Sequence, residues 1–385
     1  MLPKMEKEEK SKTRNILKLS DPLICAWPDH SFLTSLILNM NTGYDWIMNM
    51  YVQTYGSYFK VGDYVEETKL DHYPFANQNI KAGMTDVCPF VNRYLIPRDD
   101  IIRTKYRVLF DFVKEFIDKE YYITITLDRI SLIGIRIHTF TKEEYDGPPY
   151  FLHAVNIYGY DLEKGVVYCT DNFEKGRYIS KEIRIEDLNY SFSEVPLPDF
   201  ISEFEQQVKV YRNYPYCEWK FDKVLLIGLL KDYLEPRKNI DYLYNFVITP
   251  FKDTTNIGKF GIESYDLLVT YLQEFIDGKR SFLNVKDSFI DKRAFSYLKD
   301  HKRLMRLRVE YLMKNEMIEK DDNFLNQFIE LEKKADILLN LCIKADLAKS
   351  KKYVEKTLLA LDNFRNQDER LIRELLDKLK ENKKM

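Results

Sequence analysis

The sequence has little of the features that usually assign a chain to a functional class at first sight. Only five of its 385 residues are cysteines, and no two of them stand in a C-x-x-C arrangement. An odd number at uneven spacing does not indicate a disulfide framework, and the missing C-x-x-C pairs disfavour a zinc site. The net charge of −2 gives no electrostatic argument for binding to nucleic acid.

Long apolar runs and targeting segments are missing as well. The apolar run Val224–Leu230 is far too short to cross a bilayer. The charged first residues are followed by no apolar segment of the kind found in signal peptides. We therefore expect a cytoplasmic protein with reduced thiols, no membrane partner, no metal site and no cofactor of its own.

Apolar and aromatic residues, by contrast, are abundant. Hydrophobic residues make up 45% of the chain, which contains 28 tyrosines and 24 phenylalanines. A chain of this length and composition can bury a large core that is divided over two or three domains. We predict a charged N-terminal arm (1–15), a domain with the candidate site (16–200) and a mostly helical domain (201–385).

The order of the segments predicts an α+β fold for the first large domain. Three helical patterns, the first from residue 29 to just before Gly43 and the others over residues 44–55 and 101–119, come ahead of strand-like segments. These segments, rich in β-branched and aromatic residues, are 121–127, 131–140, 151–160, 166–170 and 177–185. Helices that precede about five antiparallel strands are typical of α+β folds. From residue 262 onward the helical pattern runs almost to the end and indicates a helical bundle.

The segment 151–173 carries the strongest sign of chemistry. It reads as a β-hairpin that folds about Glu163, which would place His153 opposite Phe173 and diagonal to Asp171. An imidazole beside a carboxylate on a mostly apolar surface is half of a catalytic triad, because the carboxylate fixes the tautomer and stabilises the charged ring. Such a pair can equally be a structural hydrogen bond, and both interpretations stay open.

A nucleophile would have to come from elsewhere, and Cys25 is the best-placed cysteine. It lies just ahead of an apolar helix predicted to start at Pro28 or Asp29, where unpaired amides and the helix dipole favour a thiolate. Cys25 could also be a small buried side chain. The alternatives are Cys88, which stands in a loop, and Cys169, which is in the middle of a strand with no helix end to activate it.

The pattern around the histidine resembles a known family. The matching residues are His153, Ala154, Val155, Ile157, Gly159, Tyr160, Asp161, Asp171 and Asn172. Together with Cys25 they resemble the papain-like cysteine-peptidase superfamily, and more closely the family of the butirosin biosynthesis protein H N-terminal domain from bacterial secondary-metabolite clusters. The segments 260–272 and 295–312 are similar to the second half of that family. In the superfamily the cysteine usually begins the helix, whereas here Asp29 and His30 occupy that place.

The resemblance implies a papain-like fold and a cysteine acyltransferase. By this resemblance, Cys25 would be the nucleophile, His153 the general base and Asp171 the residue that orients it. The enzyme would form an amide between a small amine and an acyl group that a carrier protein presents as a phosphopantetheine thioester. The alternatives are a non-catalytic protein on the same fold that binds a carrier protein or an acyl chain, and an intracellular cysteine peptidase or thioesterase.

A basic run in the helical half could serve such a partner. Lys302, Arg303, Arg306 and Arg308 follow one another closely in a helical segment. Such a run is usually a solvated helix face, but it could dock the acidic surface of an acyl or peptidyl carrier protein. The sequence identifies neither the acyl group nor the amine.

Overall fold

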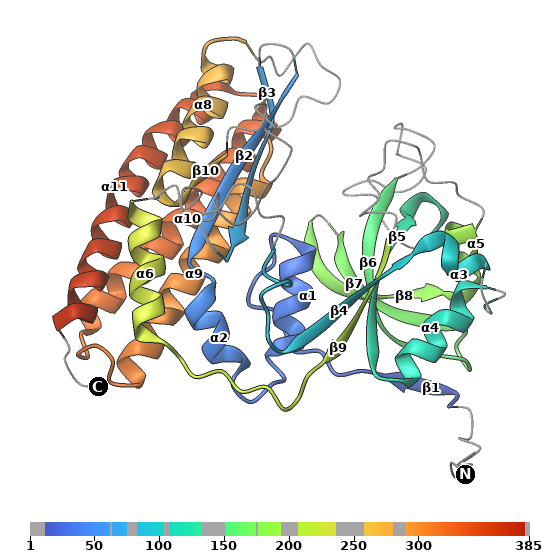
Figure 1. The fold of residues 1–385 in the computed structure, drawn as a ribbon. Helices are drawn as coiled ribbons and strands as arrows, with labels where there is room; N and C mark the ends of the chain where they lie inside the picture. The colour runs from blue at the N-terminus through green and yellow to red at the C-terminus, as the bar shows by residue number, and fades with distance from the viewer. Residues whose placement is uncertain are drawn as a thin grey trace, which may run out of the picture. The chain divides into compact units, whose positions relative to one another are not determined.

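A computed structural model of the chain describes residues 12–61, 64–74, 83–103, 106, 108–132, 151–174, 176–193, 207–235, 258–279 and 290–381. The chain forms two compact units (Figure 1). The sheet unit comprises residues 1–21, 35–39 and 89–217, and the helical unit comprises residues 22–34, 40–88 and 218–385. The chain thus passes between the units several times before it remains in the helical unit.

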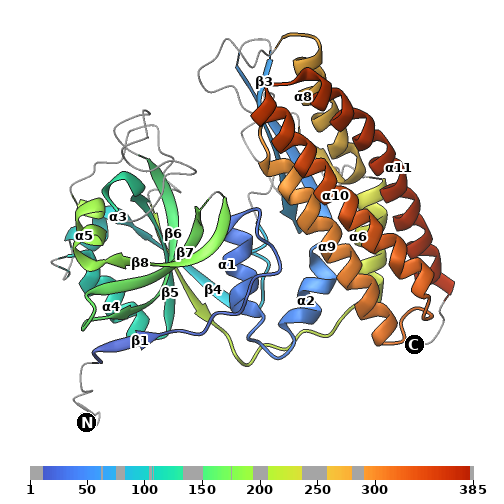
Figure 2. The same cartoon turned by 180° about the vertical axis from the view of Figure 1, so that it is seen from behind.

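The described part of the sheet unit is built on seven antiparallel strands, seen from behind in Figure 2. Their order is β4-β9-β5-β6-β7-β8, and β1 pairs with β6 beside β5. The strands are β1 (Arg14–Ile16), β4 (Val91–Pro97), β5 (Tyr121–Asp128), β6 (Leu152–Asp161), β7 (Val166–Glu174), β8 (Arg177–Arg184) and β9 (Gln207–Asn213). Gly159 lets β1 approach β6 closely, because a Cβ there would lie 2.8 Å from the carbonyl oxygen of Asn15.

Short helices cover this sheet. They are α3 (Arg98–Arg103), α4 (Leu109–Asp118), the 3-10 turn η1 (Arg129–Ser131) and α5 (Ile185–Ser193). The apolar face of α4 packs on β5 and β6, and α5 packs beside it. Inward residues of alternate strand positions complete the core, among them Ile125, Val155 and Val167.

The helical unit combines a small sheet with long helices. Its antiparallel sheet has the order β10-β2-β3, from β2 (Gln53–Val61), β3 (Tyr64–Tyr73) and β10 (Lys259–Phe260). Its helices are α2 (Gly43–Met50), α6 (Lys223–Leu234), α8 (Tyr265–Ile276), α9 (Arg293–Lys314), α10 (Asp322–Ala348) and α11 (Lys351–Glu381), with the 3-10 turn η2 (Gly261–Ser264) before α8. Helices α9, α10 and α11 pack in sequence, and α6 and α8 pack on α11 (Figure 1).

Helix α1 (Pro28–Ile37) contributes to both units. Its residues up to Thr34 belong to the helical unit, and those from Ser35 on belong to the sheet unit. Its observed start at Pro28 confirms the predicted helix and leaves no earlier turn that could include Cys25.

The mixed α+β composition and the helical second half are confirmed, but the units are not divided near residue 200 as predicted. Residues 40–88 lie in the helical unit because the β2–β3 hairpin pairs with β10 and packs on α9. Residues 14 and 15 of the predicted charged arm belong to β1, and the predicted strand 131–140 lies outside the described residues from residue 133 on. Among the described residues, no helix combines the length and apolar composition that crossing a membrane requires.

Candidate active site

The β6–β7 hairpin holds the candidate pair in the sheet unit. Near its turn, Asp161 pairs with Val166, and a bulge at Tyr158 then shifts the register so that Ile157 pairs with Cys169. Beyond the bulge the register is therefore the one that the sequence predicts. That register brings the outer end of β6, with His153, next to Asp171.

His153 and Asp171 are in direct contact. The Nδ1 atom of His153 lies 2.8 Å from Oδ2 of Asp171 and 3.0 Å from the carbonyl oxygen of Ala154. Both of these oxygens are hydrogen-bond acceptors and favour a proton on Nδ1, whereas a donor nitrogen of Arg129 also lies 3.0 Å from Nδ1. The Asp171 side chain is fully buried, whereas about a third of the His153 side chain (32%) is exposed. The imidazole is thus held by a buried carboxylate and remains accessible from outside.

Sequence reasoning missed a third member of this group, Arg129. Its guanidinium forms a buried ion pair with Oδ2 of Asp171 and lies 3.0 Å from Nδ1 of His153. Arg129 is itself only 1% exposed, and burial lowers its pKa to about 10, which leaves it charged at neutral pH. No motif marked it, because Arg129 belongs to η1 and reaches the hairpin only through the pairing of β5 with β6. Only a correct strand order would have revealed it.

The arrangement can accept and hold a proton. In the tautomer whose Nδ1–H faces the carboxylate, the lone pair of neutral His153 is on Nε2, where a general base takes a proton. The nearby rings of Phe151 and Phe173 make the surroundings apolar: Phe151 stacks parallel to His153, and Phe173 lies 5.2 Å from the Arg129 guanidinium.

Cys25 lies in the helical unit, three residues ahead of α1. Its backbone amide and that of Ala26 both donate to Oδ2 of Asp300, each at 2.7 Å. Burial and the Asp300 carboxylate raise the pKa of the Cys25 thiol, against smaller opposing effects of Arg303 and Lys299. Burial first, and then the Asp300 carboxylate, thus oppose the activation that was expected from the helix end. The thiol is protonated at neutral pH.

Burial separates Cys25 and Cys217 from the other three cysteines. All five are described, and none forms a disulfide. Cys88 is 6% exposed and Cys169 is fully buried, and burial raises the pKa of the Cys169 thiol far above its ordinary value. Cys25 and Cys217 are the two that are partly exposed. Of the cysteines considered from the sequence, Cys25 is thus the one within reach of a substrate. It belongs to a different unit from His153, and their pairing stays a prediction.

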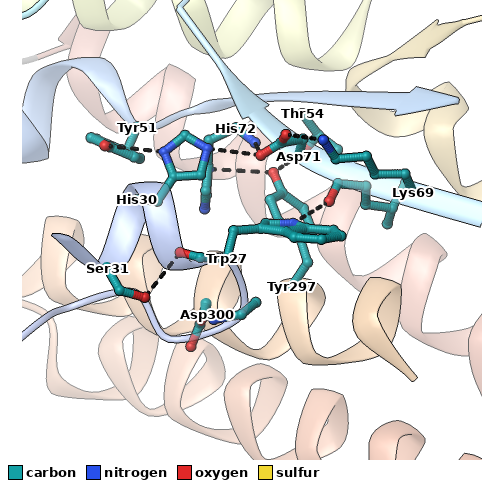
Figure 3. Close-up of polar contacts among 12 residues, drawn as sticks. Trp27, His30, Ser31, Tyr51, Thr54, Lys69, Asp71, His72, Tyr297 and Asp300 are labelled. Carbon is teal, nitrogen blue, oxygen red and sulfur yellow. Dashed lines mark hydrogen bonds and ion pairs between the residues drawn. The ribbon is translucent and has the colours of Figure 1, made fainter. Parts of the chain in front are cut away.

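A second histidine–aspartate contact, which the sequence did not suggest, lies in the helical unit (Figure 3). His30 on α1 contacts Oδ1 of Asp71 through Nε2 at 2.7 Å and the hydroxyl of Tyr51 through Nδ1 at 3.3 Å. Lys69 adds an ion pair to Asp71 at 2.9 Å. Although burial opposes it, Lys69 and His30 hold the pKa of Asp71 well below its ordinary value.

This second contact is better suited to structure than to catalysis. Both ring nitrogens of His30 are engaged, and the residue is only 8% exposed, so it offers no site for a substrate proton. His72 and Tyr297 continue the polar cluster inward, where the Tyr297 hydroxyl meets Thr54 at 2.8 Å (Figure 3). The cluster ties α1, β2, β3 and α9 together.

The predicted basic docking face is largely wrong. Lys302 and Arg308 are fully buried: Lys302 pairs with Asp368, and Arg308 donates to the carbonyl oxygens of Met48 and Tyr51 at the end of α2. Arg306 is engaged by Glu310 and Glu332. Helix α9 is packed on several sides, so its basic residues fulfil internal roles that a pattern of charge cannot show. Of the four, Arg303 alone is partly exposed without an ion pair to a described residue.

The comparisons with known proteins add no relative. No protein-family model matches the chain, and no match was found among curated proteins. The resemblance to the butirosin biosynthesis protein H family therefore stays a prediction.

Proposed function

We propose that the protein is a cysteine-dependent acyltransferase that moves an acyl group from a thioester to an amine. The observation that carries the proposal is the contact of Nδ1 of His153 with the buried carboxylate of Asp171, on a ring that remains partly exposed. Together with the partly exposed Cys25, this supplies the residue types of a Cys–His–Asp triad.

The proposed reaction has two halves. In the first, Nε2 of His153 takes the thiol proton of Cys25 as the sulfur attacks the thioester carbonyl carbon. The donor's C–S bond breaks, and the proton passes from the imidazolium to the departing thiolate, which leaves an acyl thioester on Cys25. In the second half the amine attacks this thioester and gives a proton to His153. The Cys25 sulfur then leaves, recovers the proton, and an amide is released.

The acyl donor in this proposal is carried on the phosphopantetheine of an acyl or peptidyl carrier protein, and the acceptor is a small amine. Arg303 is the remaining candidate of the basic run for contact with an acidic carrier. The backbone amides of Cys25 and Ala26 already donate to Asp300, so the proposal does not assign them as donors to the oxyanion.

One observation favours a second candidate, a non-catalytic protein that binds a carrier or an acyl chain. The Cys25 thiol has a raised pKa, with Asp300 adding to the effect of burial, whereas catalytic thiols usually have a lowered one. The experiment that decides is an assay for amide formation from an acyl thioester and a panel of amines, with product detected by mass spectrometry.

Cys25→Ala should abolish product, whereas Cys217→Ala, which removes the other partly exposed thiol, should retain it. Product from Cys25→Ala at the parent rate would remove the proposed nucleophile. Binding of the thioester without product in the parent would favour the non-catalytic candidate.

A further inference from the structure

Arg129 holds a position that the proposed triad does not require. It follows Asp128, whose carboxylate accepts from the amides of Ile130, Ser131 and Phe151 and so fixes the turn at the end of β5. From this fixed turn, Arg129 contacts both members of the pair on β6 and β7. A buried cation that contacts both a histidine and its carboxylate partner changes the electrostatic potential at the imidazole, and with it the charge that the ring carries.

We infer that Arg129 is a positioning residue that keeps the Asp171 carboxylate ionised and the His153 imidazole neutral in the resting protein. The inference rests on the proposed role of His153 as a base.

The charge of Asp171 depends on the Arg129 guanidinium. A fully buried carboxylate is ionised only with a counter-charge, because desolvation otherwise favours its neutral form. In a simple Cys–His–Asp triad the histidine would provide that charge by taking a proton. Here the guanidinium of Arg129 provides it permanently, since arginine stays protonated.

The same guanidinium disfavours a positive charge on His153. With Asp171 already neutralised, an imidazolium would be a second cation, with its Nδ1 only 3.0 Å from a guanidinium nitrogen. The ionisable residues of η1, of the last position of β5 and of the outer end of β7 are Asp128, Arg129, Cys169, Asp171 and Glu174, and Glu174 is paired with Lys181. Asp128 is engaged by backbone amides, and Cys169 is a buried neutral thiol that contacts the carbonyl of Lys181. None of these restores an unpaired negative charge beside the ring.

The consequence is a neutral resting site. Papain-like sites usually hold a thiolate and an imidazolium before substrate arrives. Here Arg129 disfavours the imidazolium, so His153 would take up a proton only during the reaction. The imidazolium would then exist only while the acyl group is transferred.

The test is an NMR titration of the His153 ring in the full chain, without substrate. Arg129→Gln should move the midpoint to higher pH by about one to three units, because Asp171 would then draw the proton to His153. Arg129→Lys, which retains the charge, should return it toward the parent value. An unchanged midpoint in Arg129→Gln would overturn the inference.

Arg129→Gln leaves Asp171 buried and unpaired and could fail to fold. A second pair of variants avoids this, namely Asp171→Asn and the double variant Arg129→Gln/Asp171→Asn. The single variant leaves an uncompensated cation beside His153, so its midpoint should lie at least about one unit below that of the double variant. Equal midpoints would overturn the inference as well. Because the titration needs neither Cys25 nor turnover, a failure of the proposed acyl transfer would appear in the amide assay and not here.

Discussion

A buried ion pair at the centre of the helical unit allows the sharpest test of the packing described here. Nζ of Lys302 on α9 lies 2.6 Å from Oδ2 of Asp368 on α11, and neither side chain is exposed. The hydroxyls of Tyr233 and Tyr265 donate to the same oxygen at 2.6 and 2.9 Å. Lys302→Met retains the length of the side chain but removes its charge, which leaves Asp368 without a cation.

The expected loss is large because the remaining carboxylate cannot reach water. Removing one partner of a buried ion pair typically costs about 3–5 kcal/mol. The two tyrosine hydroxyls still solvate Asp368 in part, so we expect about 3 kcal/mol. The double variant Lys302→Met/Asp368→Leu removes both charges and should recover most of the loss, minus the cost of the two tyrosine hydroxyls left without an acceptor.

Helix α9 offers a matched control. Lys299 lies one turn earlier and pairs with Asp336 at the same distance, 2.6 Å, but with both side chains nearly half exposed. Lys299→Met should therefore cost less than about 1 kcal/mol. Urea unfolding followed by circular dichroism at 222 nm measures all variants on one scale. If Lys302→Met were no more destabilising than Lys299→Met, the buried pair would not stabilise the bundle.

Three further outcomes are expected. Asp171→Asn should lower kcat by up to about 10⁴-fold, because the amide can hold the His153 ring in the wrong tautomer. It should also lower Tm, because the buried guanidinium of Arg129 loses its anionic partner. Activity retained per folded molecule would refute the catalytic role of Asp171. Asp300→Asn should lower the pKa of Cys25 and speed its alkylation by iodoacetamide at pH 7 several-fold, whereas an unchanged rate would show that Asp300 does not control the thiol. Burial holds the pKa values of His72 and His301 well below 6.5, so the unfolded chain alone takes up protons there. Stability should therefore fall below about pH 6.5, by about 1.4 kcal/mol per histidine and pH unit, and equal urea midpoints at pH 7.5 and 5.5 would contradict it.

Local patterns in the sequence were sufficient for the hairpin and for the start of α1. The alternation of residues 151–173 predicted the neighbours of His153, and Pro28 marked the first turn of the helix. Both features depend on residues that are close in the chain, where turn chemistry and side-chain periodicity act directly.

Contacts between distant segments could not be predicted in this way. Arg129 meets Asp171 across two strand pairings, and Asp300 meets the amide of Cys25 from 275 residues away. The basic run of α9 illustrates the same limit: Lys302 and Arg308 have the charge of a docking face but are buried because helices pack on both sides of them. A sequence records which charges are present, and packing decides which of them reach solvent.

The most direct test of the account is to locate the acyl group on the protein and to ask whether its attachment needs His153. The parent, mixed with a small acyl thioester and quenched after short times, should carry the label on Cys25, as shown by peptide mass spectrometry. His153→Ala should acquire it at least about 100-fold more slowly, because a protonated thiol needs a base to attack. A label on Cys217, or attachment to Cys25 at the same rate without His153, would contradict the proposed partnership of these two residues.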